Sequence, residues 1–146
     1  MSKSNTFEND LLQLIFNNVD IADIGDAGGL QNSATAGSLY IALHTGDPGE
    51  AGTATTNECA YTSYARVAVA RSGAGWTVAT NTSTNAALIQ FPECTGGSET
   101  ITHVSITVSS SGASKILYSG ALTASRSVSS GIQPQFAESA LVVTED

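Results

Sequence analysis

Two histidines and a large number of serines are the residues of this sequence with the potential for nucleophilic chemistry. A serine nucleophile needs a base within hydrogen-bond reach and is often carried on a G-x-S-x-G turn, which does not occur in the sequence. His44 and His103 each fall in a stretch where apolar and polar residues alternate, which is the pattern of a β-strand. We therefore expect both rings to be packed or exposed strand histidines, and we expect no catalytic residue.

Acidic residues form two sets that are candidate ligands for a divalent cation. Asp20, Asp23 and Asp26 are spaced three residues apart, whereas a calcium loop carries its Asp and Asn ligands at alternate positions. The second set, in His44–Glu50, combines one imidazole with two carboxylates of a turn. Neither set has the spacing of a metal motif. We expect solvated turn carboxylates, with no bound metal and no other cofactor.

Paired carboxylates and paired cysteines are the other groups with possible chemistry. Glycoside hydrolysis needs two converging carboxylates, and Glu93 and Glu99 flank a short loop that contains two glycines. We expect these two residues to be solvated loop acids. Cys59 and Cys94 lack C-x-x-C spacing, and two cysteines make no disulfide framework. We expect two free, partly buried thiols, although two facing strands would allow them to pair.

Charge is sparse in this sequence. Of the 146 residues, 12% are Asp, Glu, Lys or Arg, against about 25% in typical domains, and the formal net charge is −8. The basic residues are scattered apart from Arg66 and Arg71, so the clustered cations that bind phosphates are missing. We expect neither direct nucleic-acid binding nor attraction to an anionic membrane. A surface rich in Ser and Thr suits packing against other protein, because few charges need desolvation there.

The elements that must position these residues begin with an N-terminal helix. Within the first twenty residues, apolar side chains recur at helical spacing along one face. Asn5 is the expected N-cap, with Glu8 three positions later, and we expect the helix to end near Asn17 and Asn18. No apolar run nearby is long enough for a signal peptide or a membrane span, which predicts synthesis for the cytoplasm.

The pattern changes to that of β-strands from residue 38 onward. Strands are predicted at 39–44, 66–71, 76–78, 87–91, 101–108, 116–122 and 140–144. We expect the second and third of these to form a hairpin, with Trp76 as a core anchor, and Val104, Ile106 and Val108 to face the core. A polar loop over 50–62 is too long for a hairpin connection.

Repeated short strands separated by turn residues predict the fold class. They indicate a mainly β chain, an antiparallel β-sandwich or jelly-roll-like domain, preceded by an α-helix. We expect a single domain overall, with residues 1–20 as an N-terminal helix or arm and residues 38–146 as the β-sandwich.

Several segments resemble a family of small virion proteins of tailed bacteriophages. The most specific is SLYIALHTGDPGEAG at 38–52, and the resemblance continues through Tyr61 and YARVAVAR at 64–71 to GWTV at 75–78. It returns in FPECTGGSET at 91–100, in the Thr-His pair at 102–103 and in LYSGAL at 117–122. The resemblance covers nearly the whole chain. It implies a virion component that is assembled in the host bacterial cytoplasm, and it leaves the position on the particle open.

A small, acidic, β-rich protein without a catalytic motif fits best, among virion components, a capsid decoration protein that binds and stabilises the outer shell. On this interpretation the protein is not an enzyme, its partners are the major capsid protein or other virion subunits, and it is a homo-oligomer, with a trimer at three-fold positions as the expected state. The alternative is a tail, baseplate or fibre-attachment protein, although no internal repeat is visible. A glycan-binding module is a third alternative, which the scarcity of aromatic residues disfavours.

We expect eight residues to contact neighbouring subunits. Four lie on the apolar face of the N-terminal helix, which packs either on its own domain or on a neighbour, and four lie in the turn and loop after the first strand. They are Phe7, Leu11, Leu14, Ile15, Asp47, Pro48, Glu50 and Tyr61.

Overall fold

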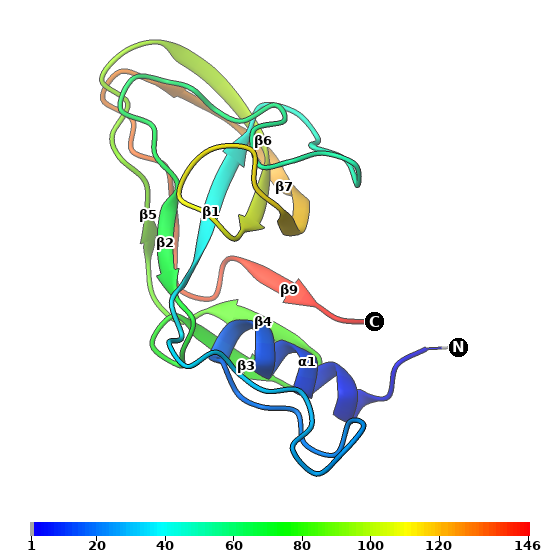
Figure 1. The fold of residues 1–146 in the computed structure, drawn as a ribbon. Helices are drawn as coiled ribbons and strands as arrows, with labels where there is room; N and C mark the ends of the chain where they lie inside the picture. Colours follow the sequence, from blue (N-terminus) through cyan, green and yellow to red (C-terminus); the bar gives the residue numbers. More distant parts are fainter. Residues whose placement is uncertain (1) are drawn as a thin grey trace. The chain divides into compact units, whose positions relative to one another are not determined.

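The computed structural model of the protein describes residues 2–146, which contain one helix and nine strands (Figure 1). The elements are α1 (Asn5–Asn17), β1 (Ser38–His44), β2 (Val67–Ala70), β3 (Trp76–Ala79), β4 (Thr82–Asn85), β5 (Ile89–Gln90), β6 (Ser98–Thr107), β7 (Ile116–Ser129), β8 (Gln135–Phe136) and β9 (Val142–Thr144). The pairs β1–β6, β6–β7, β3–β4 and β4–β9 are antiparallel. The predicted class, mainly β and antiparallel with an N-terminal helix, is confirmed.

Internal contacts divide the chain into two compact units, each assembled from separate segments. Unit 1 consists of the segments up to Ser38, Ala70–Leu88 and Phe136–Asp146, and unit 2 consists of Leu39–Val69 and Ile89–Gln135. Unit 1 holds α1 and the sheet β3-β4-β9, and unit 2 holds most of the sheet β2-β1-β6-β7 and the strand β5. The prediction of an arm over 1–20 and one sandwich over 38–146 stays a prediction.

The ends of α1 are set by two polar residues. Ser4, rather than the predicted Asn5, is the N-cap, and its Oγ accepts a hydrogen bond from the Phe7 N–H at 3.3 Å. The sequence offers two good capping residues in a row, and the extended backbone at Ser4 (φ −83°, ψ 151°) decides between them. At the other end Asn18 adopts the left-handed conformation with φ 59°, which stops the helix as predicted.

Arg71 closes the last turn of α1. The final carbonyls of a helix have no partner within the helix and carry partial negative charge. The Arg71 guanidinium donates to two of them, Leu14 O at 2.7 Å and Ile15 O at 2.8 Å, and also to Ala36 O at 3.2 Å. One side chain thus connects the helix end to the segment that leads into β1.

The core of unit 1 lies between α1 and its sheet. Leu12, Phe16 and Trp76 are fully buried, and the rings of Phe16 and Trp76 lie 4.6 Å apart between centroids at an interplanar angle of 59°. The predicted role of Trp76 as a core anchor is confirmed. The helix packs against β3 and β4 of its own chain, with the line Glu8, Leu12 and Phe16 facing inward.

The sheet of unit 1 corrects a prediction about pairing. β3 does not pair with the preceding strand; it pairs with β4, from Trp76 opposite Asn85 to Ala79 opposite Thr82. β4 was not predicted because its sequence, TSTN, has no apolar residue. It is stable there because the fully buried Asn85 side chain donates to Ala87 O and Ala137 O and accepts from the Leu141 N–H at 2.8 Å.

The central strands of unit 2 are buried more completely than the alternation of residues predicts. β1 pairs with β6 from Tyr40 opposite Thr107 to His44 opposite His103. In β6 the predicted inward residues Val104 and Ile106 are buried, but so are Ser105 and Thr107, and Val108 is 46% exposed. The prediction of one inward face is therefore wrong for this segment. Both faces of β6 are covered here, and the hydroxyls are buried because they make hydrogen bonds.

Candidate functional site

The loop after β1, residues 45–58, is held in one shape by contacts within the loop. The carboxylate of Asp47 accepts a hydrogen bond from the Gly49 N–H at 2.8 Å, which closes the predicted turn. Gly52 lies directly against the Pro48 carbonyl, because a Cβ on Gly52 would lie 1.9 Å from that oxygen. We call residues 45–58 the 45–58 loop. Its close backbone packing indicates one preferred conformation.

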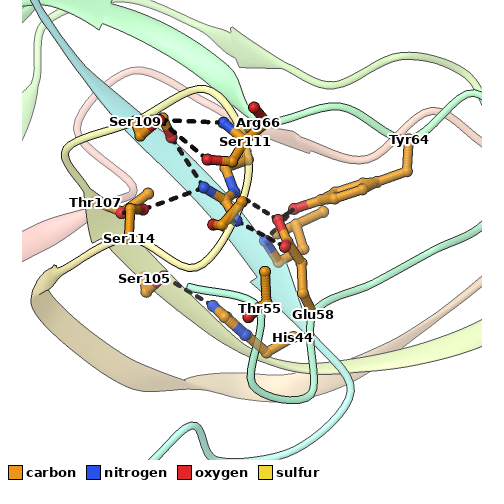
Figure 2. A network of polar contacts seen from close by, with 12 residues as sticks. His44, Thr55, Glu58, Tyr64, Arg66, Ser105, Thr107, Ser109, Ser111 and Ser114 are labelled. Carbon is orange, nitrogen blue, oxygen red and sulfur yellow. Dashed lines mark hydrogen bonds and ion pairs between the residues drawn. The ribbon is translucent and has the colours of Figure 1, made fainter. Parts of the chain in front are cut away.

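Arg66 is the buried centre of a polar network that anchors this loop (Figure 2). Its Nε and Nη2 donate to the two oxygens of Glu58, at 2.6 and 2.8 Å. The same guanidinium donates to Ser109 O at 3.0 Å and Gly112 O at 2.8 Å. The hydrogen bonds to Glu58 raise the pKa of Arg66, so the side chain stays charged. One cation therefore connects the end of the 45–58 loop with the 108–115 loop.

Tyr64 adds a third group to the ion pair. Its hydroxyl accepts a hydrogen bond from the Leu43 N–H at 3.0 Å and donates to Glu58 Oε1 at 3.1 Å. Burial raises the pKa of Tyr64, and the nearby Glu58 carboxylate raises it further. The hydroxyl thus keeps the proton that it donates, and β1 is connected to the ion pair.

His44 anchors the middle of the 45–58 loop to the sheet. The ring is fully buried, with Nδ1 2.9 Å from Thr56 O and Nε2 2.8 Å from Ser105 Oγ. A carbonyl can only accept, so Nδ1 carries the proton and Nε2 accepts from the serine hydroxyl. Burial lowers the pKa of His44 below its ordinary 6.5, which favours this neutral form.

The 108–115 loop is fastened by hydroxyls at the end of β6. Thr107 Oγ1 lies 2.6 Å from Ser114 Oγ and donates to Lys115 O at 2.7 Å. The Ala54 N–H of the 45–58 loop donates to Ser114 O at 2.9 Å. The two loops therefore hold each other as well as the sheet.

The physical role of this network is to specify loop positions. Burying a charged pair brings little net stability, but removing one partner of such a pair costs about 3–5 kcal/mol because the other charge is left uncompensated. Only conformations that bring Glu58, Arg66 and the loop carbonyls together avoid this cost. The network thus holds the two loops in one defined arrangement.

His44 and Ser105 are the residue types of a base and a nucleophile in hydrogen-bond contact. Their burial indicates a structural role for this contact. A catalytic serine must reach a substrate, whereas Ser105 is 1% exposed and His44 is fully buried. The Nδ1 atom of His44 faces a neutral carbonyl. The predicted strand histidine is confirmed at His44, where the ring connects a loop to a sheet.

Several of the carboxylates considered for chemistry accept hydrogen bonds from the backbone. The Glu99 carboxylate accepts hydrogen bonds from the Ala60 and Tyr61 N–H groups at 2.9 and 3.0 Å, whereas Glu93 is exposed. Asp20 and Asp26 accept backbone hydrogen bonds within their own loop. Among residues 2–146 no group of three His, Cys, Asp or Glu residues could hold a metal ion. In the same residues, no helix is long and apolar enough to cross a lipid bilayer.

The eight residues predicted to contact other subunits fall in both units. In α1, Phe7 is the most accessible, 37% exposed, whereas the other three helix residues are half-buried. In unit 2, Asp47 and Glu50 are exposed, and Pro48 is buried. Tyr61 is 3% exposed and donates to Pro92 O at 3.0 Å, and burial raises its pKa to about 12. Their role as an interface stays a prediction.

Both cysteines are buried free thiols in unit 2, as predicted. Burial raises the pKa of Cys59 to about 12, and the Glu99 carboxylate contributes to the same shift. The Cys94 thiol donates to Gly96 O at 3.2 Å. The raised pKa of Cys59 and the burial of both side chains are not the properties of a reactive cysteine.

The network itself was not predicted from the sequence. Glu58 precedes Arg66 by eight residues across an irregular segment, a spacing that matches no regular element. Arg66 stands at the start of an apolar, small-residue strand, which was the one available signal of a cation directed inward. Ser105 and Thr107 gave no signal, because serine and threonine are abundant throughout the chain.

The fold is mainly β, and comparison with known families places the chain among the virion structural proteins of tailed phages. The matching family model is described as podophage GP4 fiber I protein gp80, and the match spans residues 2–144. The chain belongs to this family, as the predicted resemblance to tailed-phage virion proteins implied. No curated protein matches the chain.

Proposed function

We propose that this chain is a structural subunit of a phage fibre or tail-associated assembly, that it acts by binding other virion subunits, and that it has no enzymatic activity. The observation that carries the proposal is the family match over residues 2–144, whose description names a fibre protein. The alternative predicted from the sequence, a tail or fibre location, is therefore better supported than capsid decoration. The trimer predicted from the sequence stays a prediction.

The polar network supports a role in binding. Subunits in a virion must present the same surface in every copy, and the network fixes the 45–58 loop through Glu58, Arg66 and His44. Asp47 and Glu50 are exposed on that loop. We propose that the loop contacts a neighbouring virion subunit, with the network holding it in the bound conformation beforehand.

Fractionation of purified particles tests the location. Heads are separated from tails and fibres, and the chain is quantified in each fraction by mass spectrometry. We expect it in the tail and fibre fraction. Recovery with tail-free heads, at a copy number close to that of the capsid protein, would overturn the fibre proposal in favour of decoration.

A complementation experiment tests the loop. Particles are assembled from a phage that lacks the gene, with the protein supplied as Glu50→Lys or as Glu93→Lys, a matched change at another exposed acid of unit 2. We expect the first variant to be depleted from particles and the second to be retained. Equal incorporation of both folded variants would exclude the loop as a contact.

A further inference from the structure

β7 is an edge strand of the four-stranded sheet. The strand order is β2-β1-β6-β7, and in the part of the chain that the structure describes β7 pairs with β6 alone (Figure 1). An edge strand directs a row of backbone N–H and C=O groups outward, and proteins often protect such rows with charged residues or proline. β7 contains no proline and one charged residue, Arg126, and its residues 119–121 are exposed. This edge therefore offers backbone hydrogen bonds to another strand.

The hydrogen bonds of Leu43 in β1 establish the direction of the backbone groups in this sheet. The Leu43 N–H donates to Tyr64 Oη at 3.0 Å, and Leu43 O accepts from the Cys59 N–H at 2.8 Å. Both backbone groups of Leu43 therefore face away from β6, although Leu43 lies opposite Val104 of that strand. In an antiparallel ladder, such a non-hydrogen-bonded pair means that Val104 directs its own N–H and C=O to the other side, toward β7.

The same alternation identifies the outward groups of β7. Val104 lies opposite Gly120, so Gly120 exchanges hydrogen bonds with β6. Its two neighbours, Ser119 and Ala121, then direct their N–H and C=O groups outward. The outward side of the edge thus carries the donors and acceptors of these two residues, and an extended strand is the partner that matches them.

The regular part of this edge is short. β7 is in continuous register with β6 over residues 118–121, and the register shifts on both sides of this segment. Irregularities of this kind bend an edge strand and limit how far another strand can pair with it. The geometry thus permits one short strand pair and opposes open-ended stacking of sheets.

Gly120 stands within this regular segment, and its surroundings in the chain give no reason for a glycine. Its φ lies outside the left-handed region, and a Cβ at this position would meet nothing within 4 Å. A glycine inside a strand weakens the strand, and it often marks a place where another backbone approaches closely. A strand from another molecule would account for this residue.

We infer that β7 pairs with β7 of a second copy, antiparallel and about a two-fold axis at Gly120. Ser119 of each copy then lies opposite Ala121 of the other, and the outward groups of both residues form two hydrogen-bonded pairs. Gly120 lies opposite Gly120, in the non-hydrogen-bonded pair where two strands approach most closely. The two sheets become continuous, and the closed contact gives a dimer rather than the trimer predicted from the sequence. The inference goes beyond the proposed function and does not depend on where in the virion the chain is placed.

The distribution of charge favours a second copy at this edge. The chain carries a net charge of −8, so two copies repel each other at surfaces that carry carboxylates. Residues 116–125 contain no Asp, Glu, Lys, Arg or His. The flanking cations, Lys115 and Arg126, lie outside the paired segment. Two copies can therefore meet along this segment without like charges facing each other.

Sedimentation equilibrium of the purified full chain measures the contact. We expect a monomer–dimer equilibrium that stops at the dimer, because a two-fold contact is closed. Raising the salt concentration should not weaken the dimer, since salt screens the repulsion between two acidic chains. A chain that stays monomeric at all concentrations would overturn the inference and leave the edge to a strand of a different virion protein.

Two double variants test the register of the pair. Ser119→Lys/Ala121→Lys places like charges directly opposite each other in the dimer, whereas Ser119→Glu/Ala121→Lys places opposite charges there. We expect the dissociation constant of the first variant to exceed that of the second about tenfold or more. General repulsion acts in the other direction, because the first variant adds two positive charges to an acidic chain. Equal dissociation constants would therefore exclude this register.

Amide hydrogen exchange resolved by residue locates the contact. In the monomer the N–H groups of Ser119 and Ala121 face outward, whereas the N–H of Gly120 is bonded to β6. We expect the first two amides to become protected as the protein concentration rises, and Gly120 to be protected throughout. A dimer in which Ser119 and Ala121 exchange as fast as in the monomer would use another surface and would overturn the inference.

Proline at the edge separates a lost contact from a lost fold. Ala121→Pro removes an outward N–H and no hydrogen bond to β6, which is the arrangement in which a strand tolerates proline. We expect this variant to keep the circular dichroism of the wild type and to stay monomeric at concentrations where the wild type is dimeric. Gly120→Pro is the matched change, and it should destabilise unit 2 because it removes a bond to β6. A folded Ala121→Pro that dimerises like the wild type would contradict the pairing.

Discussion

Replacing Arg66 by methionine tests whether the network holds the loops of unit 2. Methionine keeps much of the arginine volume but removes the charge and all five donors. The Glu58 carboxylate would lose two hydrogen bonds, at 2.6 and 2.8 Å, while its side chain is only 15% exposed, and Ser109 O and Gly112 O would lose their donor. An uncompensated buried charge costs about 3–5 kcal/mol. We therefore expect the free energy of unfolding of unit 2 to decrease by about that amount.

The double variant Arg66→Met/Glu58→Gln separates the charge effect from lost packing. It removes the charge of Glu58 together with that of Arg66, so no buried charge is left without a partner. The double variant should therefore be more stable than Arg66→Met alone, by about 1–3 kcal/mol. Arg126→Met is the matched control, since the same change at an exposed arginine should stay within about 0.5 kcal/mol.

Hydrogen exchange with mass spectrometry is the appropriate assay, because it reports the two units separately. Trp76, the one tryptophan, lies in unit 1, so its fluorescence would not report on this site. We expect the 45–58 and 108–115 loops to lose protection together in Arg66→Met, with the segments of unit 1 unchanged. A loss under about 1 kcal/mol, or a double variant no more stable than the single one, would refute the reasoning.

Four further predictions concern single residues. Burial lowers the pKa of His44, so as pH falls below the ordinary value of 6.5 the unfolded chain takes up a proton that the folded chain does not. The free energy of unfolding should therefore decrease as pH falls towards the pKa of the folded state. Urea unfolding at several pH values should show this decrease in the wild type and not in His44→Gln. Gly52→Ala should destabilise the 45–58 loop by about 2–4 kcal/mol, because its Cβ would overlap Pro48 O. In the control Gly120→Ala the Cβ meets nothing within 4 Å, so the unfolding midpoint should change little. Cys59, with a pKa of about 12, should react with a thiol reagent at neutral pH only after denaturation; rapid labelling of the native protein would contradict its burial. Arg71→Gln should lower the stability of unit 1 by about 1–3 kcal/mol, because Leu14 O and Ile15 O lose their donor. Hydrogen exchange in the last turn of α1 should then be faster. Unchanged exchange would mean that water satisfies the two carbonyls.

The local periodicity of the sequence was enough to find most elements. The helix at 5–17 and the strands β1, β2, β3 and β6 were predicted within a few residues, because apolar spacing reflects which face of an element is buried. β7 was predicted to end at 122, whereas it continues to Ser129 through mostly small, exposed residues. β4 was not found, since TSTN has no apolar period and depends on Asn85 hydrogen bonds to residues about fifty positions away. The pairing of β3 with β4 could not be predicted either, because short turns join β3 both to the strand before it and to the strand after it.

What the sequence by itself determined is the class: a charge-poor, acidic, mainly β chain with a helix at its start, resembling virion proteins of tailed phages. What only the tertiary structure decided is the site. His44 meets Ser105 across 61 residues, and Arg66 meets Ser109 across 43. Such contacts are made by side chains that look ordinary in their own neighbourhoods. They acquire a role when strand pairing removes water from around them, and a buried charge or hydroxyl must then find its partner wherever the fold has placed it.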